Sequence, residues 1–365
     1  MNPAAPASVS LESRSARTRN GDTTSSGWVV SGYAMLAVRF VQGFIYWGGG
    51  SRRFIYAPQK LDPHAANWMA NKLQSAMPGA ILGTGHIVDF LLRHFSLLYA
   101  SVIFFSAVEL IFGLFLMLGL FTRLSALVTI ALSFVLMLLF GWQGATCIDE
   151  WTMAACNFAM GMSLLAAGSS AWSLDALISR RLPAVASHAW FPWVASGSLP
   201  LERFRPTSLL LTVITIAFVT LTYNYYRGAI LTPYHSGPTS PSLHHLSISE
   251  ARKTAQGGVS FNVYLDGGTA DVPAHVVGIF GLDADGRTVA EWTAKQLAAL
   301  PPSAIINDYH YNRFTVGVLG LAAGMGARAH IVLPPPALGD ESQATQIELQ
   351  TIDNKMFAAP LVSMP

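Results

Sequence analysis

The sequence predicts a multi-domain membrane protein, in which an N-terminal α-helical transmembrane bundle is followed by a soluble all-β sandwich. Three observations predict this fold class. Hydrophobic residues make up 52% of the 365 residues and charged residues only 12%, against about 25% in soluble proteins. Five long apolar runs precede residue 227, each close to the roughly 20 residues that a membrane-spanning helix needs. Beyond them the pattern changes to short alternating apolar runs bounded by Gly, Pro and Asp.

The five runs predict a four-helix membrane domain and a fifth, linking helix. The predicted spans are residues 28–47, 97–121, 124–142, 151–171 and 208–226. The first run is too long for a cleaved signal peptide and lacks an Ala-x-Ala site, so it is interpreted as a retained signal anchor. The expected domains are a disordered leader at 1–27, the four-helix domain at 28–175, a loop at 176–206, the fifth helix at 207–227 and the β-rich domain at 228–365.

Lys and Arg near the helix ends predict the orientation in the membrane. A cytoplasmic N-terminus leaves Arg123, Arg180 and Arg181 on the cytoplasmic side. An odd number of spans then makes the β-rich domain external, or periplasmic for a multi-pass protein of the plasma (inner) membrane. The external loop 48–94 is basic, against the rule, but it is long enough for the rule to weaken.

The β-rich region predicts six strands, with Asp285-Gly286 as a hairpin turn and residues 233–241 as the linker before the sandwich. The expected strands are residues 259–265, 275–282, 288–293, 314–319, 329–333 and 347–352. In the loop 48–94, residues 64–77 predict an amphipathic helix that lies on the membrane.

Two spans each contain a single charged residue, Arg39 in the first and Glu109 in the second. An unpaired charge at the bilayer centre costs at least about 2.5 to 3.5 kcal/mol, so a partner is expected. In antiparallel neighbouring helices both residues would lie about eleven residues from the same membrane face, near 16 Å. The sequence therefore predicts an Arg39–Glu109 ion pair. It serves either to orient two helices or to line a quinone or proton site.

Polar residues in the external loop suggest ligand contacts. Arg52, Arg53 and Lys60 follow a glycine run, and clustered arginine side chains match tetrahedral oxyanions such as sulfur oxoacids. Contact with lipid headgroups explains the same cluster equally well. His86 and His94, on either side of Asp89, are candidates for quinone or proton contact.

The two cysteines, Cys147 and Cys156, form neither a CxxC nor a CxxCH motif, so a thioredoxin-type pair and attached haem are unsupported. No haem, flavin or metal motif is recognisable, and the β-rich region has no cysteine for a blue-copper site. Cys147 is either an ordinary small residue or a redox thiol that accepts a sulfur species. A net charge of +2 gives no electrostatic indication of nucleic acid binding.

Several motifs resemble a known family. An arginine in the first helix, a glycine-rich exit with a lysine, and Glu109 followed by FGLFLMLGLFTRLSAL resemble the four-helix DoxX/DoxD membrane family. The stretch GWQGATCIDEWTMAACNFAMG is similar to DoxD in particular. The C-terminal motifs AHVVGIF, AEWTAKQLAALPPSAIIND and RAHIVLP resemble DoxA. The whole resembles a DoxD/DoxA fusion, the small-subunit pair of thiosulfate:quinone oxidoreductase.

The resemblance implies a thiosulfate dehydrogenase (quinone), which oxidises thiosulfate to tetrathionate and passes electrons to a membrane quinone as its acceptor. The residues then predict a catalytic set of Glu109, Arg39 and Cys147, with thiosulfate near Arg52, Arg53 and Lys60. The alternative is a non-catalytic DoxX-like subunit or anchor of a quinol oxidase or sulfur-oxidising complex. The expected partners are thiosulfate, quinone and the lipid bilayer, with a terminal quinol oxidase and a second copy of the chain left open.

Overall fold

The computed structural model describes residues 27–144, 149–197, 201–228 and 239–362. The chain divides into two compact units. The first unit holds Met1–Pro58, Ile103–Val135 and Ala154–Leu221, and the second holds Gln59–Val102, Leu136–Met153 and Thr222–Pro365.

Long apolar helices make this chain a membrane protein. Among the described residues, three helices are long and apolar enough to cross a membrane: α5 (Phe95–Leu118), α6 (Thr122–Phe140) and α11 (Leu201–Arg227). A fourth span results if Gly27–Ala34 and Leu36–Tyr56, which meet at a 44° bend, are counted as one. The fourth predicted span falls on α7 (Glu150–Ala167), which contains Glu150 and Asn157 and is not among these candidate spans.

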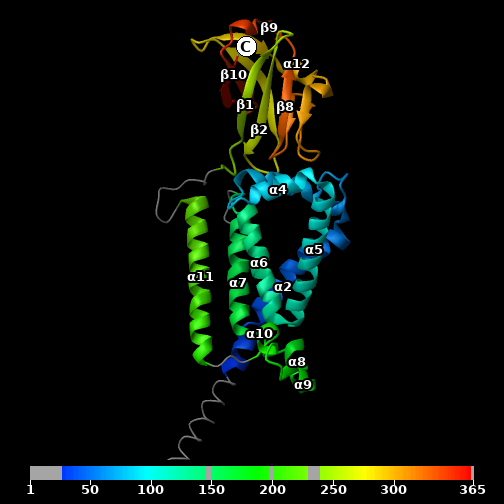
Figure 1. The fold of residues 1–365 in the computed structure, drawn as a ribbon, viewed down its shortest axis with the longest axis vertical. Helices are drawn as coiled ribbons and strands as arrows, with labels where there is room; N and C mark the ends of the chain where they lie inside the picture. The colour runs from blue at the N-terminus through cyan, green and yellow to red at the C-terminus, as the bar shows by residue number, and fades with distance from the viewer. Residues whose placement is uncertain (1–26, 145–148, 198–200, 229–238, 363–365) are drawn as a thin grey trace, which may run out of the picture. The chain divides into compact units, whose positions relative to one another are not determined.

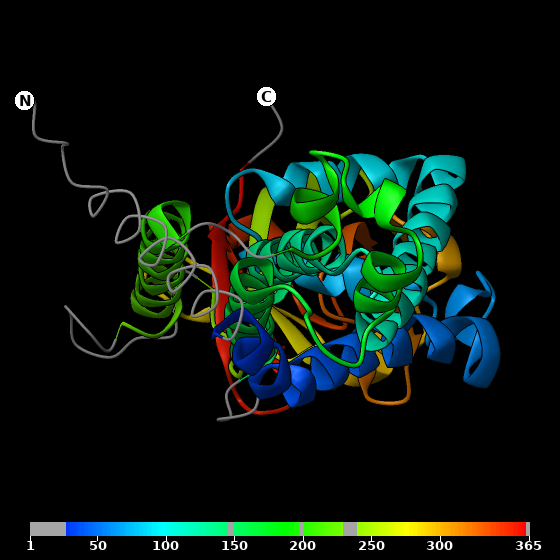
Figure 2. The same ribbon diagram turned by 90° about the horizontal axis from the view of Figure 1, so that it is seen from below.

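Within the first unit, α2 (Leu36–Ser51) lies beside α5, α6 and α7, while α11 runs along the edge next to α7 (Figure 1, Figure 2). Glycines bring α2 and α5 into close contact. A Cβ atom on Gly113 would lie 2.3 Å from the backbone nitrogen of Trp47, and one on Gly50 would lie 2.6 Å from that of Leu110. Small residues allow helix backbones in membranes to pack this closely.

Three short helices follow α7 in the first unit: α8 (Leu174–Arg181), α9 (Pro183–Ala186) and α10 (Phe191–Val194). A buried carboxylate fixes them to the turn between α5 and α6. Asp175 accepts hydrogen bonds from the backbone N–H groups of Phe121 (2.8 Å) and Thr122 (3.0 Å), and from the hydroxyl of Ser196 (2.9 Å). Each hydrogen bond to a charged group contributes about 1.5–3 kcal/mol, so this attachment is firm.

The second unit begins with α3 (Met69–Ala76) and α4 (Thr84–Arg93). Helix α3 occupies the predicted amphipathic segment 64–77 but begins at Met69, and its buried face contacts protein. The Gln74 side chain donates to the carbonyl oxygens of Asn312 (2.9 Å) and Gly326 (2.8 Å) and accepts from the Asn312 N–H (2.9 Å). A buried amide with three such bonds fixes α3 to the β-rich part.

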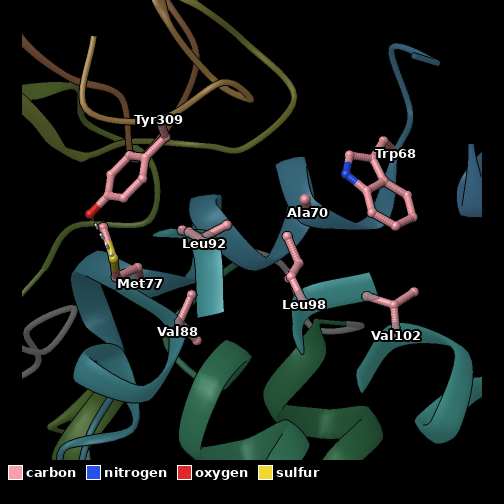
Figure 3. Close-up of a cluster of buried hydrophobic side chains, with 8 residues drawn as sticks. All are labelled: Trp68, Ala70, Met77, Val88, Leu92, Leu98, Val102 and Tyr309. Carbon is pink, nitrogen blue, oxygen red and sulfur yellow. Dashed lines mark hydrogen bonds between the residues drawn. The ribbon is translucent and has the colours of Figure 1, made fainter. Parts of the chain in front are cut away.

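An apolar cluster supports the same attachment (Figure 3). Trp68 and Met77 flank α3, Leu92 comes from α4, and Tyr309 comes from the β-rich part. All four side chains are at most 6% exposed, so the contact excludes water.

The β-rich part is an all-β domain of two antiparallel sheets, which confirms the predicted fold class. One sheet has the order β1-β2-β8-β5 and the other β11-β10-β3-β4-β9, with β7 beside β3 and β6. The strands are β1 (His245–Thr254), β2 (Gly258–Gly267), β3 (Ala274–Leu282), β4 (Thr288–Trp292), β5 (Ile305–Asn307), β6 (Phe314–Gly317), β7 (Gly320–Ala323), β8 (Arg328–Leu333), β9 (Leu338–Gly339), β10 (Gln346–Thr351) and β11 (Met356–Pro360).

All six predicted strands are present, as β2, β3, β4, β6, β8 and β10. Gly286, with a φ of +77°, forms the predicted turn between β3 and β4. The longest missed strand is β1, whose polar sequence HLSISEARKT hides its alternation. Of the other predicted segments, the leader before Gly27 and the linker up to residue 238 lie outside the described residues.

Candidate functional site

Glu109 forms an ion pair in the first unit, with Arg53 as its partner. The Arg53 Nη1 atom lies 2.5 Å from Glu109 Oε2, and the two side chains are only 18% and 20% exposed. Arg53 lies in a π-helical turn, Arg52–Tyr56, that directly continues α2. Gly49 makes room for the carboxylate, because a Cβ atom there would lie 2.9 Å from Glu109 Oε2.

The predicted pair between Glu109 and Arg39 is wrong. Arg39 donates instead to the Ser169 hydroxyl and to the carbonyl oxygens of Ala171 (3.3 Å) and Trp172 (2.7 Å). The prediction ended the first helix at residue 47, whereas the helical path continues to Tyr56. This continuation adds a second arginine fourteen residues, or about 21 Å, further along the helix, and that arginine reaches Glu109.

A row of uncharged polar side chains lies among the helices of the first unit. Gln42 donates to the Thr129 hydroxyl (3.2 Å) and the Asn157 carbonyl (2.8 Å). The Tyr46 hydroxyl lies 2.6 Å from the Ser133 hydroxyl, and it donates to the Thr129 carbonyl at 3.0 Å. The Gln42 Oε1 atom is buried and accepts no hydrogen bond from the described residues. The i, i+4 spacing of Gln42 and Tyr46 in an apolar helix is a sequence signal that could have revealed this row.

The predicted arginine fork does not form. Arg52 is exposed, while Arg53 donates to Glu109 and, at 3.4 Å, to the Ser106 hydroxyl. Because Arg53 is held by Glu109 while Arg52 is exposed, the two guanidinium groups do not converge on one anion. Lys60 belongs to the second unit, where it lines a cavity.

This cavity has a volume of about 730 Å³. Its polar lining comes from the segment before α3, from α3 itself, from the residues between α6 and α7, from the start of α7 and from the β-rich part. The lining includes Lys60, Asn67, Trp68, Asn71, Lys72, Ser75, Gln143, Asp149, Glu150, Gly268, Thr269, Asp271 and Asn312. The indole N–H of Trp68 is buried and has no hydrogen-bond acceptor among the described residues.

The charges around the cavity are largely paired. Lys72 lies 2.6 Å from Glu150, and Asp149 pairs with Arg227. Gly144 and Asp149 line the cavity and flank residues 145–148. Cys147 belongs to this segment and lies outside the described residues.

Asp89 is the centre of a second polar cluster, between α4 and the β domain of the second unit. Its carboxylate accepts hydrogen bonds from the Tyr309 hydroxyl and from Arg93 Nε (3.2 Å), and Arg328 lies 4.0 Å away. Burial alone would raise the pKa of Asp89, but the Tyr309 hydrogen bond and the Arg93 pairing outweigh it and hold the pKa below its usual value. Burial, followed by the bond to Asp89, raises the pKa of Tyr309.

The two predicted quinone contacts do not join this cluster. His86 and His94 are both exposed, and the His94 ring packs on Phe90 at 4.3 Å, with Nδ1 2.7 Å from the Phe90 carbonyl. Cys156, on α7, is a free, exposed thiol. The part of the chain that the structure describes contains no group of three or more His, Cys, Asp or Glu side chains that could hold a metal ion.

Two family models match the chain in tandem. The model described as TQO small subunit DoxD matches residues 34–202, and the model described as TQO small subunit DoxA matches residues 227–359. The first match contains Arg39, Arg53 and Glu109 together with helices α2, α5, α6 and α7, and the second contains the β domain. No solved structure matches the chain.

Proposed function

Because this chain is a DoxD/DoxA fusion, which joins the two small subunits of thiosulfate:quinone oxidoreductase in one polypeptide, we propose that it oxidises thiosulfate and passes the electrons to a membrane quinone. Two thiosulfate ions join through a new S–S bond to give tetrathionate and release two electrons. The quinone takes up these electrons and two protons to become a quinol. The observation that carries the proposal is the Arg53–Glu109 pair, a titratable carboxylate among apolar helices.

Glu109 supplies protons to the reduced quinone in this proposal. A carboxylate can take up a proton from water and release it to a quinone oxygen, whereas the hydroxyls and amides around Gln42 cannot ionise at neutral pH. Arg53 compensates the negative charge of Glu109 while the site is deprotonated. Arg39 is proposed to hold the helices in place, since its partners are neutral oxygens.

Thiosulfate is proposed to bind in the cavity of the second unit, on the external, periplasmic side of the inner membrane. Lys60 supplies a positive charge there. N–H donors come from Asn67, Asn71 and the Trp68 indole, which has no acceptor among the described residues. These groups suit the oxygens of a sulfur oxoanion. Arg52 and Arg53 belong to the first unit and do not line this cavity.

Further roles are proposed for His86, His94 and Cys147. His86 and His94 are proposed to contact quinone or to carry protons, since both side chains are exposed. Cys147 is proposed to form a transient S–S bond with the outer sulfur of one thiosulfate, while the two electrons released pass to the quinone. The second thiosulfate then attacks that sulfur, breaks the bond to Cys147 and leaves as tetrathionate, which restores the cysteine thiolate. Full thiosulfate turnover in Cys147→Ser would exclude this covalent step.

The decisive experiment uses the purified full chain in detergent with thiosulfate and a soluble quinone analogue. We expect quinone reduction, followed by the absorbance change of the analogue, with one tetrathionate formed for each quinol. Reduction that appears only after membranes containing an oxidase are added would identify the chain as a non-catalytic subunit or anchor.

Lys60→Gln tests the proposed anion site. The variant loses one charge facing a dianion, so we expect the KM for thiosulfate to rise about tenfold, with kcat nearly unchanged. The matched control is Lys295→Gln on α12 (Ala294–Ala298), an exposed lysine away from the cavity. Equal KM values for the two variants would move thiosulfate binding elsewhere.

A further inference from the structure

The segment after α7 contains large apolar side chains that are exposed among the described residues of the first unit. They form what we call the aromatic foot: Trp172, Leu177, Leu182, Trp190 and Trp193. Each of these side chains is between 45% and 79% exposed. A surface with three indole rings is costly to leave in water.

The aromatic foot is held firmly in place. Asp175, completely buried, fixes the start of α8 to the turn before α6. Arg123 fixes the other end, since its guanidinium donates to the carbonyls of Pro192 and Gly197 (3.1 Å), on either side of Trp193. Both anchors are buried, so the exposure of the indoles is a property of the folded unit.

Two arginines without acidic partners accompany the foot. Arg180 and Arg181 end α8, and both side chains are exposed. Among the described residues no carboxylate lies within ion-pair distance of either guanidinium group. Their charge is therefore available to an external anion.

The exposed tryptophans and the two arginines together indicate which kind of partner this surface binds. Tryptophan prefers the headgroup region of a bilayer, where its ring meets acyl chains and its N–H meets water. Arginine forms bidentate hydrogen bonds with phosphate oxygens. Trp172 follows the end of α7 by only five residues, in a chain whose neighbouring helices are apolar enough to span a membrane. A soluble protein partner would not need this combination next to membrane-spanning helices.

We propose that the aromatic foot, together with Arg180 and Arg181, is a binding surface for anionic phospholipid headgroups of the adjacent leaflet. The indoles and leucines insert at the boundary of the acyl chains, and the two guanidinium groups hold the phosphates. This surface is separate from the proposed electron-transfer site and does not depend on it.

The test measures lipid selectivity of the full chain in detergent. Delipidated protein is mixed with equal amounts of phosphatidylglycerol and phosphatidylcholine, and native mass spectrometry counts the lipids retained. We expect wild type to prefer phosphatidylglycerol and the Arg180→Gln/Arg181→Gln variant to lose about 30-fold of that preference, because each of the two basic residues near the surface favours anionic lipid by about 1 kcal/mol. Arg180→Lys/Arg181→Lys keeps the charge and should keep most of the preference.

The matched control removes two exposed arginines from the β domain, Arg287→Gln/Arg313→Gln, and should leave the preference unchanged. Thermal unfolding in phosphatidylcholine alone verifies that each variant is folded. An unchanged preference in the folded Arg180→Gln/Arg181→Gln variant would overturn the proposal. So would an equal loss in the control, which would indicate a nonspecific effect of net charge.

Discussion

Two arginines of the first helical path, Arg39 and Arg53, face buried surroundings of opposite character. Arg39 is 5% exposed and donates to neutral oxygens of Ser169, Ala171 and Trp172. Arg53 pairs with Glu109, whose charge can change. Carbonyl and hydroxyl oxygens do not gain or lose a proton near neutral pH, so the partners of Arg39 keep the same charge. The carboxylate beside Arg53 can gain and lose a proton, and the arginine stabilises its charged form. The comparison separates a cation among neutral oxygens from a cation beside a titratable carboxylate.

The largest effect on turnover is expected for Glu109, the titratable partner of Arg53. Glu109→Gln keeps the shape of the side chain but removes its titratable proton, so we expect quinone reduction with thiosulfate to fall about 100-fold, as for the loss of a general acid or base. The control is Glu202→Gln, an exposed glutamate in the first turn of α11. Unchanged turnover in folded Glu109→Gln would assign Glu109 to helix packing alone.

Arg39→Met tests whether Arg39 stabilises the fold without a direct role in turnover. The variant leaves the Ser169 hydroxyl and two carbonyls without their donor, and each unsatisfied buried group costs about 1–3 kcal/mol. We expect the free energy of unfolding to fall by about 3 kcal/mol, measured by thermal unfolding in detergent, while turnover per folded molecule stays near wild type. Arg205→Met, on the exposed surface of α11, is the control. A stable Arg39→Met protein with strongly reduced turnover would reverse the two roles.

Gly113→Ala sharpens the comparison because it acts on the distance between the helices. The new methyl group would meet the Trp47 backbone at 2.3 Å, which must push α2 away from α5. Overpacking of this kind costs about 1–3 kcal/mol, and the displacement should also weaken the Arg53–Glu109 contact and lower turnover. Gly48→Ala, where a Cβ atom meets nothing within 4 Å, is the matched control. If both variants behave alike, the glycine contact does not position the pair.

In the second unit, Asp89 is a further paired carboxylate, and its substitution has the smallest expected effect. Because its folded pKa is depressed, its stabilising contribution is present above its unfolded value of 3.8 and is lost as the pH falls through the folded pKa below that value. Hydrogen exchange around Tyr309 should therefore lose protection below pH 3.8 in wild type. Asp89→Asn should show reduced protection at neutral pH and no such step. A step that persists in the variant would have to come from another carboxylate.

The sequence predicted those features that depend on neighbours along the chain. Apolar runs revealed α5, α6 and α11, and alternation revealed strands such as β3. It also predicted that Glu109 needs a cation, from the cost of burying a charge. The predicted partner was the wrong arginine, because three glycines in a row suggested that the helix ends there. In the structure, neighbouring helices support a helical path that continues through Gly48–Gly50.

Features that join distant segments could not be predicted. The Asp89–Tyr309 hydrogen bond connects residues 220 apart, and the Gln74–Asn312 contacts connect residues 238 apart. No periodicity in either segment indicates its partner. Likewise, Lys60 was predicted to share an anion site with Arg52 and Arg53, but it lines a cavity of the second unit, and this separation depends on the tertiary fold.

The π-helical turn at the end of α2 has a consequence for how the family tolerates insertions and deletions. The Ala57 N–H bonds to the Arg52 carbonyl, so this turn closes over five residues and contains one residue more than an α-helical turn would. Loss of one residue after Arg53 would convert it to an ordinary turn and leave the ion pair intact. Loss of one residue between Gly43 and Arg53 would rotate Arg53 by about 100° away from Glu109. Length changes in related chains should therefore accumulate after the arginine and be absent between the glycines and the arginine.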